Sequence, residues 1–140
     1  MKNLGGLKYF LGIEVARSKR GIFLSQKKYV LDLLSEIGML DCRPTDTPVV
    51  QNHGLGEFPN QTLINKERYQ RLVGKLIYLS HTRPDIAYAV SLVSQFMHCP
   101  SKDHMSAVVR ILRYLKSSPR RGLMFTKNQH LHIDDYTDAN

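Results

Sequence analysis

The sequence of 140 residues has no tryptophan, only two cysteines and no long hydrophobic run. Cys42 and Cys99 form no Cys-x-x-Cys pair and lack ligand-like spacing to a pair of histidines, so we expect ordinary thiols in a reducing, intracellular compartment. No apolar stretch approaches the roughly 20 residues of a membrane span, and the N-terminus lacks the hydrophobic segment of a signal peptide. We therefore expect no membrane partner.

Acidic residues are also scarce, with 12 Asp and Glu against 20 Lys and Arg, for a formal net charge of +8. The basic residues concentrate in three segments, residues 1–30, 66–83 and 100–121, each of which holds a single acid. Such a charge favours polyanionic partners, above all nucleic acid, although a merely soluble basic protein remains the alternative. Three basic segments around an apolar interior predict a surface that follows a phosphate backbone.

Hydrophobic periodicity and turn residues predict an α+β chain. Gly12 lies inside the first expected strand, where it indicates a bulge or a close backbone approach, and Gly21 provides the positive φ of a hairpin loop. Ser25, Asn65 and Ser101 are expected helix N-caps. The expected strands are Leu7–Val15, Ile22–Ser25, Leu123–Thr126 and Leu131–Tyr136; the expected helices are Gln26–Ile37, Lys66–His81, Pro84–His98 and Lys102–Ser117.

The last three helices each carry one apolar row, which predicts that they pack as a three-helix bundle. Tyr88 and Tyr114 are expected in its core. Pro84 and Asp85 have the positions of a helix start, where proline presets φ and an acid complements the helix dipole. The apolar rows are Leu72/Leu76/Leu79, Ile86/Val90/Val93/Met97 and Val108/Ile111/Leu112/Leu115.

A series of motifs in a fixed order resembles the Pol polyprotein of copia-type (Ty1/copia) retrotransposons, with a plant-transposon character. The resemblance covers nearly the whole chain and points to the end of the reverse transcriptase and the first strand of ribonuclease H. The motifs are LGGLKYFLGIEV (4–15), GIFLSQKKY (21–29), YQRLVGKLIYL (69–79), TRPDIAYAV (82–90), QFM (95–97), RYLK (113–116) and YTDA (136–139).

The resemblance implies four parts of the chain. Residues 1–38 would be the end of the palm with a primer-grip-like hairpin and helix, and residues 39–64 a long connector, either between two lobes or as a mobile tether. Residues 65–121 would be a thumb-like three-helix bundle. Residues 122–140 would be the β stub of a truncated ribonuclease H-like domain, lacking the rest of its sheet.

The resemblance also implies roles for individual residues. Phe10, Leu11 and Gly12 would hold the primer end. Gln70, Gly74 and Tyr78 recur at i, i+4 and i+8, so they share a helix face that would enter the minor groove of an RNA–DNA or DNA duplex; the alternative is that Tyr78 packs in the core and Gln70 is solvated. Phosphate contacts would come from Lys66, Arg71 and Lys75. Asp138 resembles the first metal-binding aspartate of ribonuclease H, and an exposed acid is the alternative.

The sequence departs from the family pattern where catalysis is concerned. It contains no Tyr-x-Asp-Asp motif, whose carboxylates hold two metal ions for nucleotidyl transfer, and Asp138 lacks its partner carboxylates. We expect no enzymatic activity and no cofactor for this chain alone. In the parent family the cofactor would be Mg²⁺, and the remainder of a Pol polyprotein is an expected partner. The alternatives are a stand-alone basic nucleic-acid-binding module and a non-functional transposon relic.

Overall fold

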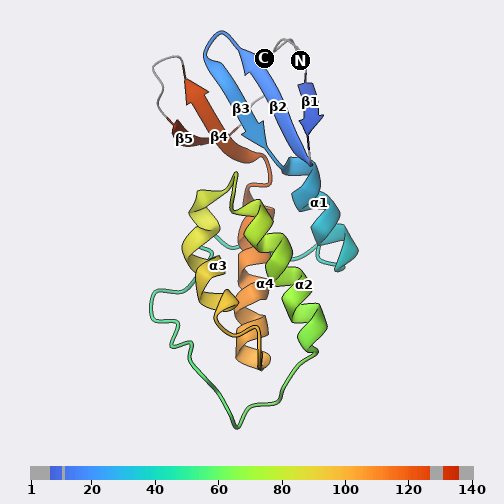
Figure 1. The fold of residues 1–140 in the computed structure, drawn as a ribbon, viewed down its shortest axis with the longest axis vertical. Coiled ribbons are helices and arrows are strands. Elements are labelled where there is room, and N and C mark those ends of the chain that lie inside the picture. Colours follow the sequence, from blue (N-terminus) through green and yellow to red (C-terminus); the bar gives the residue numbers. More distant parts are fainter. Residues whose placement is uncertain (1–6, 11, 127–130, 136–140) are drawn as a thin grey trace. The chain divides into compact units, whose positions relative to one another are not determined.

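The structure, a computed structural model, describes residues 7–10, 12–126 and 131–135. The chain divides into two compact units. The sheet unit comprises Met1–Asp41 and Ser118–Asn140, and the helical unit comprises Cys42–Ser117. Figure 1 shows the ribbon with all elements labelled.

The sheet unit is built on an antiparallel sheet whose five strands lie side by side in chain order. Two glycines shape it: Gly12 (φ 81°) occupies a turn, and Gly21 (φ 145°) is a position where a Cβ atom would overlap the carbonyl oxygen of Phe125 on β4. The strands are β1 (Leu7–Phe10), β2 (Ile13–Ser18), β3 (Gly21–Ser25), β4 (Arg121–Thr126) and β5 (Leu131–Asp135).

Two sequence predictions for this unit are wrong. The strand expected over Leu7–Val15 is two strands, because Phe10 pairs with Ile13 across a two-residue connection, so Gly12 serves a tight hairpin turn rather than a bulge. The strands of residues 122–140 are not a separate domain, because β4 pairs with β3 from Gly21↔Thr126 to Ser25↔Gly122 and so extends the first sheet.

Helix α1 (Lys27–Glu36) follows β3 and buries Val30, Leu33 and Leu34. Ser25 accepts a hydrogen bond from the Lys27 amide with Oγ (3.2 Å), although the N-cap position itself is Gln26. Helix α1 ends in a Schellman motif. The amide of Gly38 donates to Ser35 O (3.1 Å), and the amide of Met39 donates to Leu34 O (2.7 Å). Gly38, with a φ of 73°, therefore ends the helix, one residue beyond the expected span Gln26–Ile37.

The helical unit packs α2 (Lys66–Leu79), a short 3₁₀ turn η1 (Pro84–Ile86), α3 (Ala87–Ser94) and α4 (Lys102–Ser117) around one core. The apolar rows predicted for the three helices are buried except for Met97, which is half-buried. Tyr69 is fully buried and donates from its hydroxyl to Val93 O (2.6 Å). Burial raises the pKa of Tyr69 well above its usual value, so this donor keeps its proton.

Two further predictions fail in α3. The helix ends at Ser94 rather than His98, because the amides of Gln95 and Phe96 turn back to carbonyls three residues earlier. Tyr88 is 63% exposed instead of lying in the core, whereas Tyr114 is buried as predicted.

Residues 42–64 form no helix or strand, yet they lie against the bundle through His104 of α4. The His104 ring is buried and stacks on Phe96 and Phe58, with centroids 3.9 and 5.3 Å away. Its Nδ1 accepts from the Ser101 amide (2.9 Å), so Nε2 carries the proton and donates to Gly56 O (2.8 Å). The His104 side chain thus satisfies the Ser101 amide at the start of α4 and also holds Gly56, so the segment is anchored rather than a free tether.

Candidate nucleic-acid interface

Helix α2 forms because its sequence supplies both a cap and an amphipathic pattern. Asn65 accepts a hydrogen bond from the Arg68 amide with its side chain (2.9 Å), which confirms the predicted N-cap. The buried side of the helix is apolar and packs in the bundle, which leaves a polar side facing outward. The buried residues are Tyr69, Leu72, Val73, Leu76 and Leu79.

The outer side carries a row of four residues at a spacing of four, which we call the α2 row: Lys66, Gln70, Gly74 and Tyr78. Lys66 and Gly74 are exposed, and Gln70 and Tyr78 are half-buried. A Cβ atom at Gly74 would meet no atom within 4 Å. The structure thus places three predicted contact residues and one predicted phosphate ligand in a single line along the helix.

Gln70 and Tyr78 both have partners within the helical unit. The Gln70 amide donates from Nε2 to Met97 O (2.8 Å), so it is held in place and is not simply solvated. The Tyr78 ring meets the His81 ring edge-on, with centroids 5.9 Å apart. These contacts fix the two polar side chains that flank Gly74.

Positive charge lies beside the α2 row. Arg71 is exposed and Lys75 is half-buried, one position further around the helix than Gln70 and Gly74. The side chain of Ile77 on the same helix is 40% exposed and adds apolar surface. The outer side of α2 therefore combines cationic groups, a gap at Gly74 and partly exposed apolar surface.

The segment after α2 is held by an ion pair that the sequence analysis missed. Arg83 is 1% exposed, and its Nε and Nη2 donate to the two carboxylate oxygens of Asp85 (3.1 and 3.0 Å). Tyr114 on α4 donates from its hydroxyl to Asp85 Oδ2 (2.6 Å), and the Arg83 guanidinium lies 5.8 Å from the centre of the Tyr114 ring. The signal in the sequence was the opposite charges on either side of Pro84, which we interpreted only as a helix start.

The Asp85 carboxyl responds to opposing influences. Burial would raise its pKa, but the hydrogen bonds from Arg83 and Tyr114 and the charge of Arg83 outweigh burial and hold the pKa below its usual value. Asp85 is therefore ionised at neutral pH and ties the α2–α3 connection to α4.

The predicted primer-gripping residues belong to the sheet unit, whereas the α2 row belongs to the helical unit. Gly12 is exposed in the turn that follows Phe10. Leu11 and Asp138 lie outside the described residues. The metal-binding role predicted for Asp138 therefore stays a prediction.

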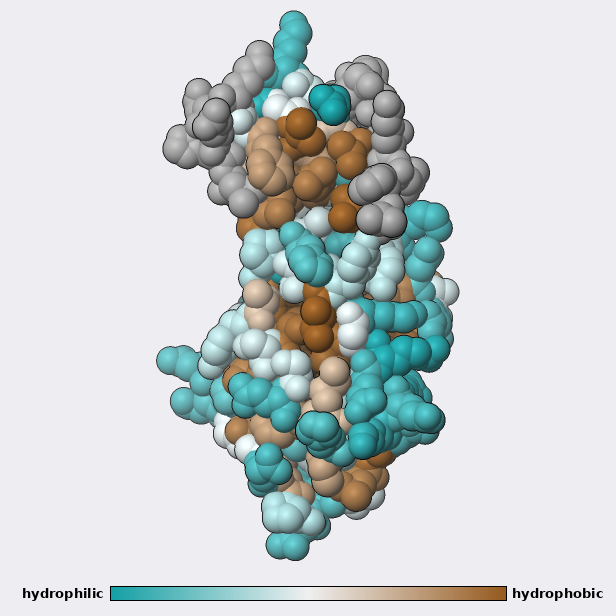
Figure 2. All heavy atoms as spheres, viewed as in Figure 1, coloured by the Kyte–Doolittle hydropathy of each residue, from teal (hydrophilic) through white to brown (hydrophobic). Residues whose placement is uncertain are grey.

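In the part of the chain that the structure describes, no three His, Cys, Asp or Glu side chains are grouped so that they could hold a metal ion. None of the described helices is long and apolar enough to cross a membrane. Figure 2 shows that hydrophilic residues cover most of the viewed surface of the helical unit, and that hydrophobic residues gather on the viewed side of the sheet.

Comparison with known proteins identifies relatives over almost the full chain. The Pol polyproteins of the Arabidopsis thaliana transposons RE1 and RE2 are 44% and 43% identical over 95% of this chain, which covers 9% of each polyprotein. The mitochondrial protein AtMg00810 of Arabidopsis thaliana is 38% identical over 99% of this chain, which covers 58% of that protein.

No protein-family model and no solved structure matches the chain. The relatives nonetheless include Pol polyproteins of transposons from plants and a transposon protein from yeast. Since these matches run along nearly all of the 140 residues, the chain belongs to the Pol polyproteins of copia-type retrotransposons and spans a small part of their length.

Proposed function

We propose that the α2 row, with Arg71 and Lys75, binds the backbone of an RNA–DNA or DNA duplex, and that this segment contributes the template–primer grip to a longer reverse transcriptase and ribonuclease H. In this proposal Phe10, Leu11 and Gly12 hold the primer end. The remainder of the Pol polyprotein supplies the Mg²⁺ sites and the chemistry.

The observation that carries the proposal is Gly74. Glycine in the interior of an exposed helix destabilises it by roughly 0.5–1 kcal/mol relative to alanine. Packing in the helical unit gives no reason for this glycine, because a Cβ atom there would meet nothing within 4 Å. Duplex binding would explain the glycine, because the missing side chain lets the backbone of a nucleic-acid strand approach the helix axis closely.

The surrounding charges support the same proposal. Lys66 and Arg71 are exposed, and Lys75 lies one turn from Arg71. Each basic group that neutralises a phosphate releases counterions, so we expect sequence-independent binding that weakens steeply with salt. Gln70, held by Met97 O, would present a fixed amide to the groove.

Fluorescence anisotropy with a labelled RNA–DNA hybrid over a series of salt concentrations tests the charges. The double variant Arg71→Ala/Lys75→Ala should weaken binding and lower the log–log salt slope by about 1 for each lost phosphate contact. The matched control Arg43→Ala/Lys102→Ala removes the same charge from exposed positions of the helical unit. Equal losses in both double variants would show a non-specific charge effect and overturn the assignment.

A second variant separates close approach from charge. Gly74→Val adds bulk at the open position and leaves every charge in place, so affinity should drop while the salt slope stays unchanged. Circular dichroism checks that the helix is retained. Binding equal to that of the parent chain would mean that the duplex does not approach α2 at Gly74.

We also propose that the 140 residues alone neither extend a primer nor cleave RNA in a hybrid. The sequence has no Tyr-x-Asp-Asp motif to hold the metal ions of primer extension, and Asp138 lacks the partner carboxylates that RNA cleavage needs. Primer extension on a poly-rA/oligo-dT template with Mg²⁺ or Mn²⁺ tests the first part. Cleavage of a labelled hybrid tests the second, and metal-dependent cleavage that disappears in Asp138→Asn would contradict it.

A further inference from the structure

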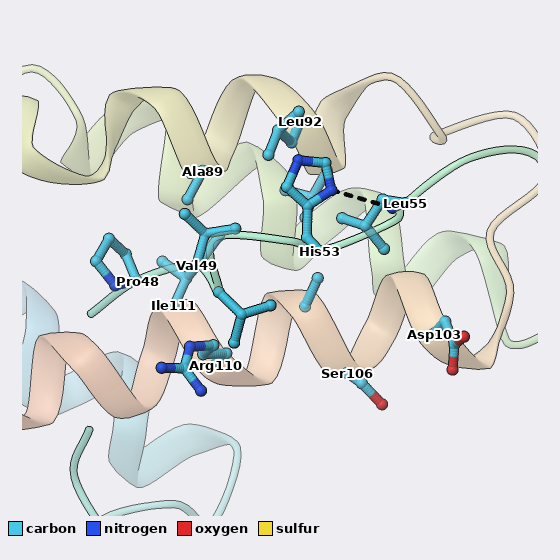
Figure 3. Close-up of a pocket in the computed structure, with 13 residues that line it drawn as sticks. Pro48, Val49, His53, Leu55, Ala89, Leu92, Asp103, Ser106, Arg110 and Ile111 are labelled. Atoms are coloured by element: carbon cyan, nitrogen blue, oxygen red, sulfur yellow. Dashed lines mark hydrogen bonds between the residues drawn. The ribbon is translucent and has the colours of Figure 1, made fainter. Parts of the chain in front are cut away.

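The helical unit contains a pocket of about 200 Å³ that the proposed duplex contact does not use. It lies between the segment 48–55 and the helices α3 and α4, as Figure 3 shows. Its walls are mainly apolar, with Val49 and Leu55 from the segment, Ala89 and Leu92 from α3, and Ile111 from α4.

The size of the pocket limits what it can hold. A dry protein cavity of about 150 Å³ accommodates benzene, whereas pockets for drug-sized ligands start at about 300 Å³. A volume near 200 Å³ therefore suits one ring or one branched chain of similar size with a small polar group attached.

The two ends of the pocket differ in charge. Arg110 and Asp103 both lie on α4, two helical turns apart, and Figure 3 shows them at opposite ends. Asp103 is exposed, and its Oδ2 already accepts a hydrogen bond from Gln61 (3.0 Å). An anionic group in the pocket would therefore lie at the Arg110 end, away from the carboxylate.

Arg110 offers a donor that the described protein does not use. Its Nη2 donates to Thr47 Oγ1 (2.6 Å), which holds the guanidinium, while its Nε is buried and has no hydrogen-bond partner among the described residues. A buried donor without a partner is costly, and an acceptor oxygen would satisfy it. On the wall, His53 Nδ1 accepts from the Leu55 amide (3.0 Å), which leaves Nε2–H as a second donor.

We propose that this pocket binds small carboxylic acids with one apolar ring or branched chain. The apolar part packs against Val49, Leu92 and Ile111, and the carboxylate accepts the unused hydrogen bond of Arg110. The acid can be a free molecule or the C-terminal carboxylate of a peptide that ends in an apolar residue, because both present the same chemistry.

The test is a titration of the full chain with benzoate, with benzyl alcohol as the neutral counterpart of similar size, followed by amide chemical shifts in NMR spectra. Benzoate should shift amides of segment 48–55, α3 and α4 and bind roughly tenfold more tightly than benzyl alcohol, as a charge-assisted hydrogen bond predicts. Acetyl-Gly-Phe, titrated in parallel, tells whether the peptide form or the free acid binds more tightly.

Three variants make the test specific. Arg110→Met should reduce the affinity for benzoate to that for benzyl alcohol, whereas the control Lys116→Met removes the same charge from the same helix and should leave both affinities unchanged. Ala107→Phe places a ring in the pocket and should abolish binding of both probes. Benzoate binding that survives Ala107→Phe, or shifts in no pocket residue of the folded parent chain, would overturn the proposal.

Discussion

The helical unit and the sheet unit bury their apolar residues in different ways. In the helical unit three helices surround one core, in which residues such as Leu76, Ile86 and Ile111 are 0% exposed. In the sheet unit, Ala16, Phe23 and Met124 form a buried cluster, whereas Phe125 on the neighbouring position of β4 is 41% exposed. The helices shield one another on several sides, while a single sheet layer has two faces to cover. We therefore expect tertiary packing to dominate stability in the helical unit and strand pairing to contribute more in the sheet unit.

The largest effect that separates the two units should come from Arg83→Ala. Removing one partner of a buried ion pair leaves Asp85 without its charge partner, so the free energy of unfolding of the helical unit should fall by about 3–5 kcal/mol. Urea unfolding followed by circular dichroism measures the loss, and hydrogen exchange locates it. Arg68→Ala, an exposed change on α2, is the control. Equal loss of amide protection in β2 and β3 would contradict a stabilising role that is confined to the helical unit.

Gly21→Ala should act on the sheet unit instead. The added Cβ atom overlaps Phe125 O and would sit at a φ of 145°, so β3 and β4 must shift apart at a cost of about 1–3 kcal/mol. Hydrogen exchange should show faster exchange in these two strands and unchanged protection in α2 and α4. Gly56→Ala, where a Cβ atom meets nothing within 4 Å, serves as the control and should change little.

Acidification should lower the free energy of unfolding of the helical unit by less than the substitution Arg83→Ala does. The pKa of Asp85 is lower in the folded chain than in the unfolded chain, so the ionised carboxylate contributes stability above the unfolded pKa. This contribution is lost as the pH falls through the folded pKa. Urea titrations from neutral pH down to about pH 2 should therefore show a falling free energy of unfolding, with a shallower fall in Asp85→Asn. Identical slopes in both proteins would show that Asp85 has no such role.

The smallest expected effect is a gain in stability from Gly74→Ala. Gly74→Ala removes the conformational freedom of glycine without a clash, so the melting temperature should rise, corresponding to roughly 0.5–1 kcal/mol. Thermal unfolding by circular dichroism measures it. A loss of stability would mean that the glycine has a structural purpose, which would remove the main support for duplex contact at this position.

The sequence predicted features whose determinants are local. The apolar row Leu72/Leu76/Leu79 and the side chain of Asn65 lie within one helix, and both positions are confirmed. The prediction that Tyr88 lies in the core is wrong, because Tyr88 lies outside the row Ile86/Val90/Val93 that faces the core. Local pattern also could not distinguish a glycine bulge from the turn at Gly12.

The features that sequence reasoning missed depend on distant partners. Asp85 accepts a hydrogen bond from Tyr114 on another helix, and β4 pairs with β3 across most of the chain. Periodicity gives no information on such pairings. For the candidate site, the helix spacing that aligns Gln70, Gly74 and Tyr78 was predictable, but the engagement of Gln70 by Met97 O was not.

The pairing of β3 with β4 has a consequence for the order in which the chain folds. These strands lie roughly 100 residues apart in sequence, so their contact carries a large loop-closure cost unless the intervening chain is already compact. The helical unit makes it compact: Arg113 Nε donates to Arg43 O (2.7 Å) and the Thr45 amide donates to Arg113 O (3.3 Å), which joins the two ends of this unit. Within this segment, the helices would therefore condense first, through contacts of shorter range, and β4 and β5 would complete the sheet on β3 afterwards.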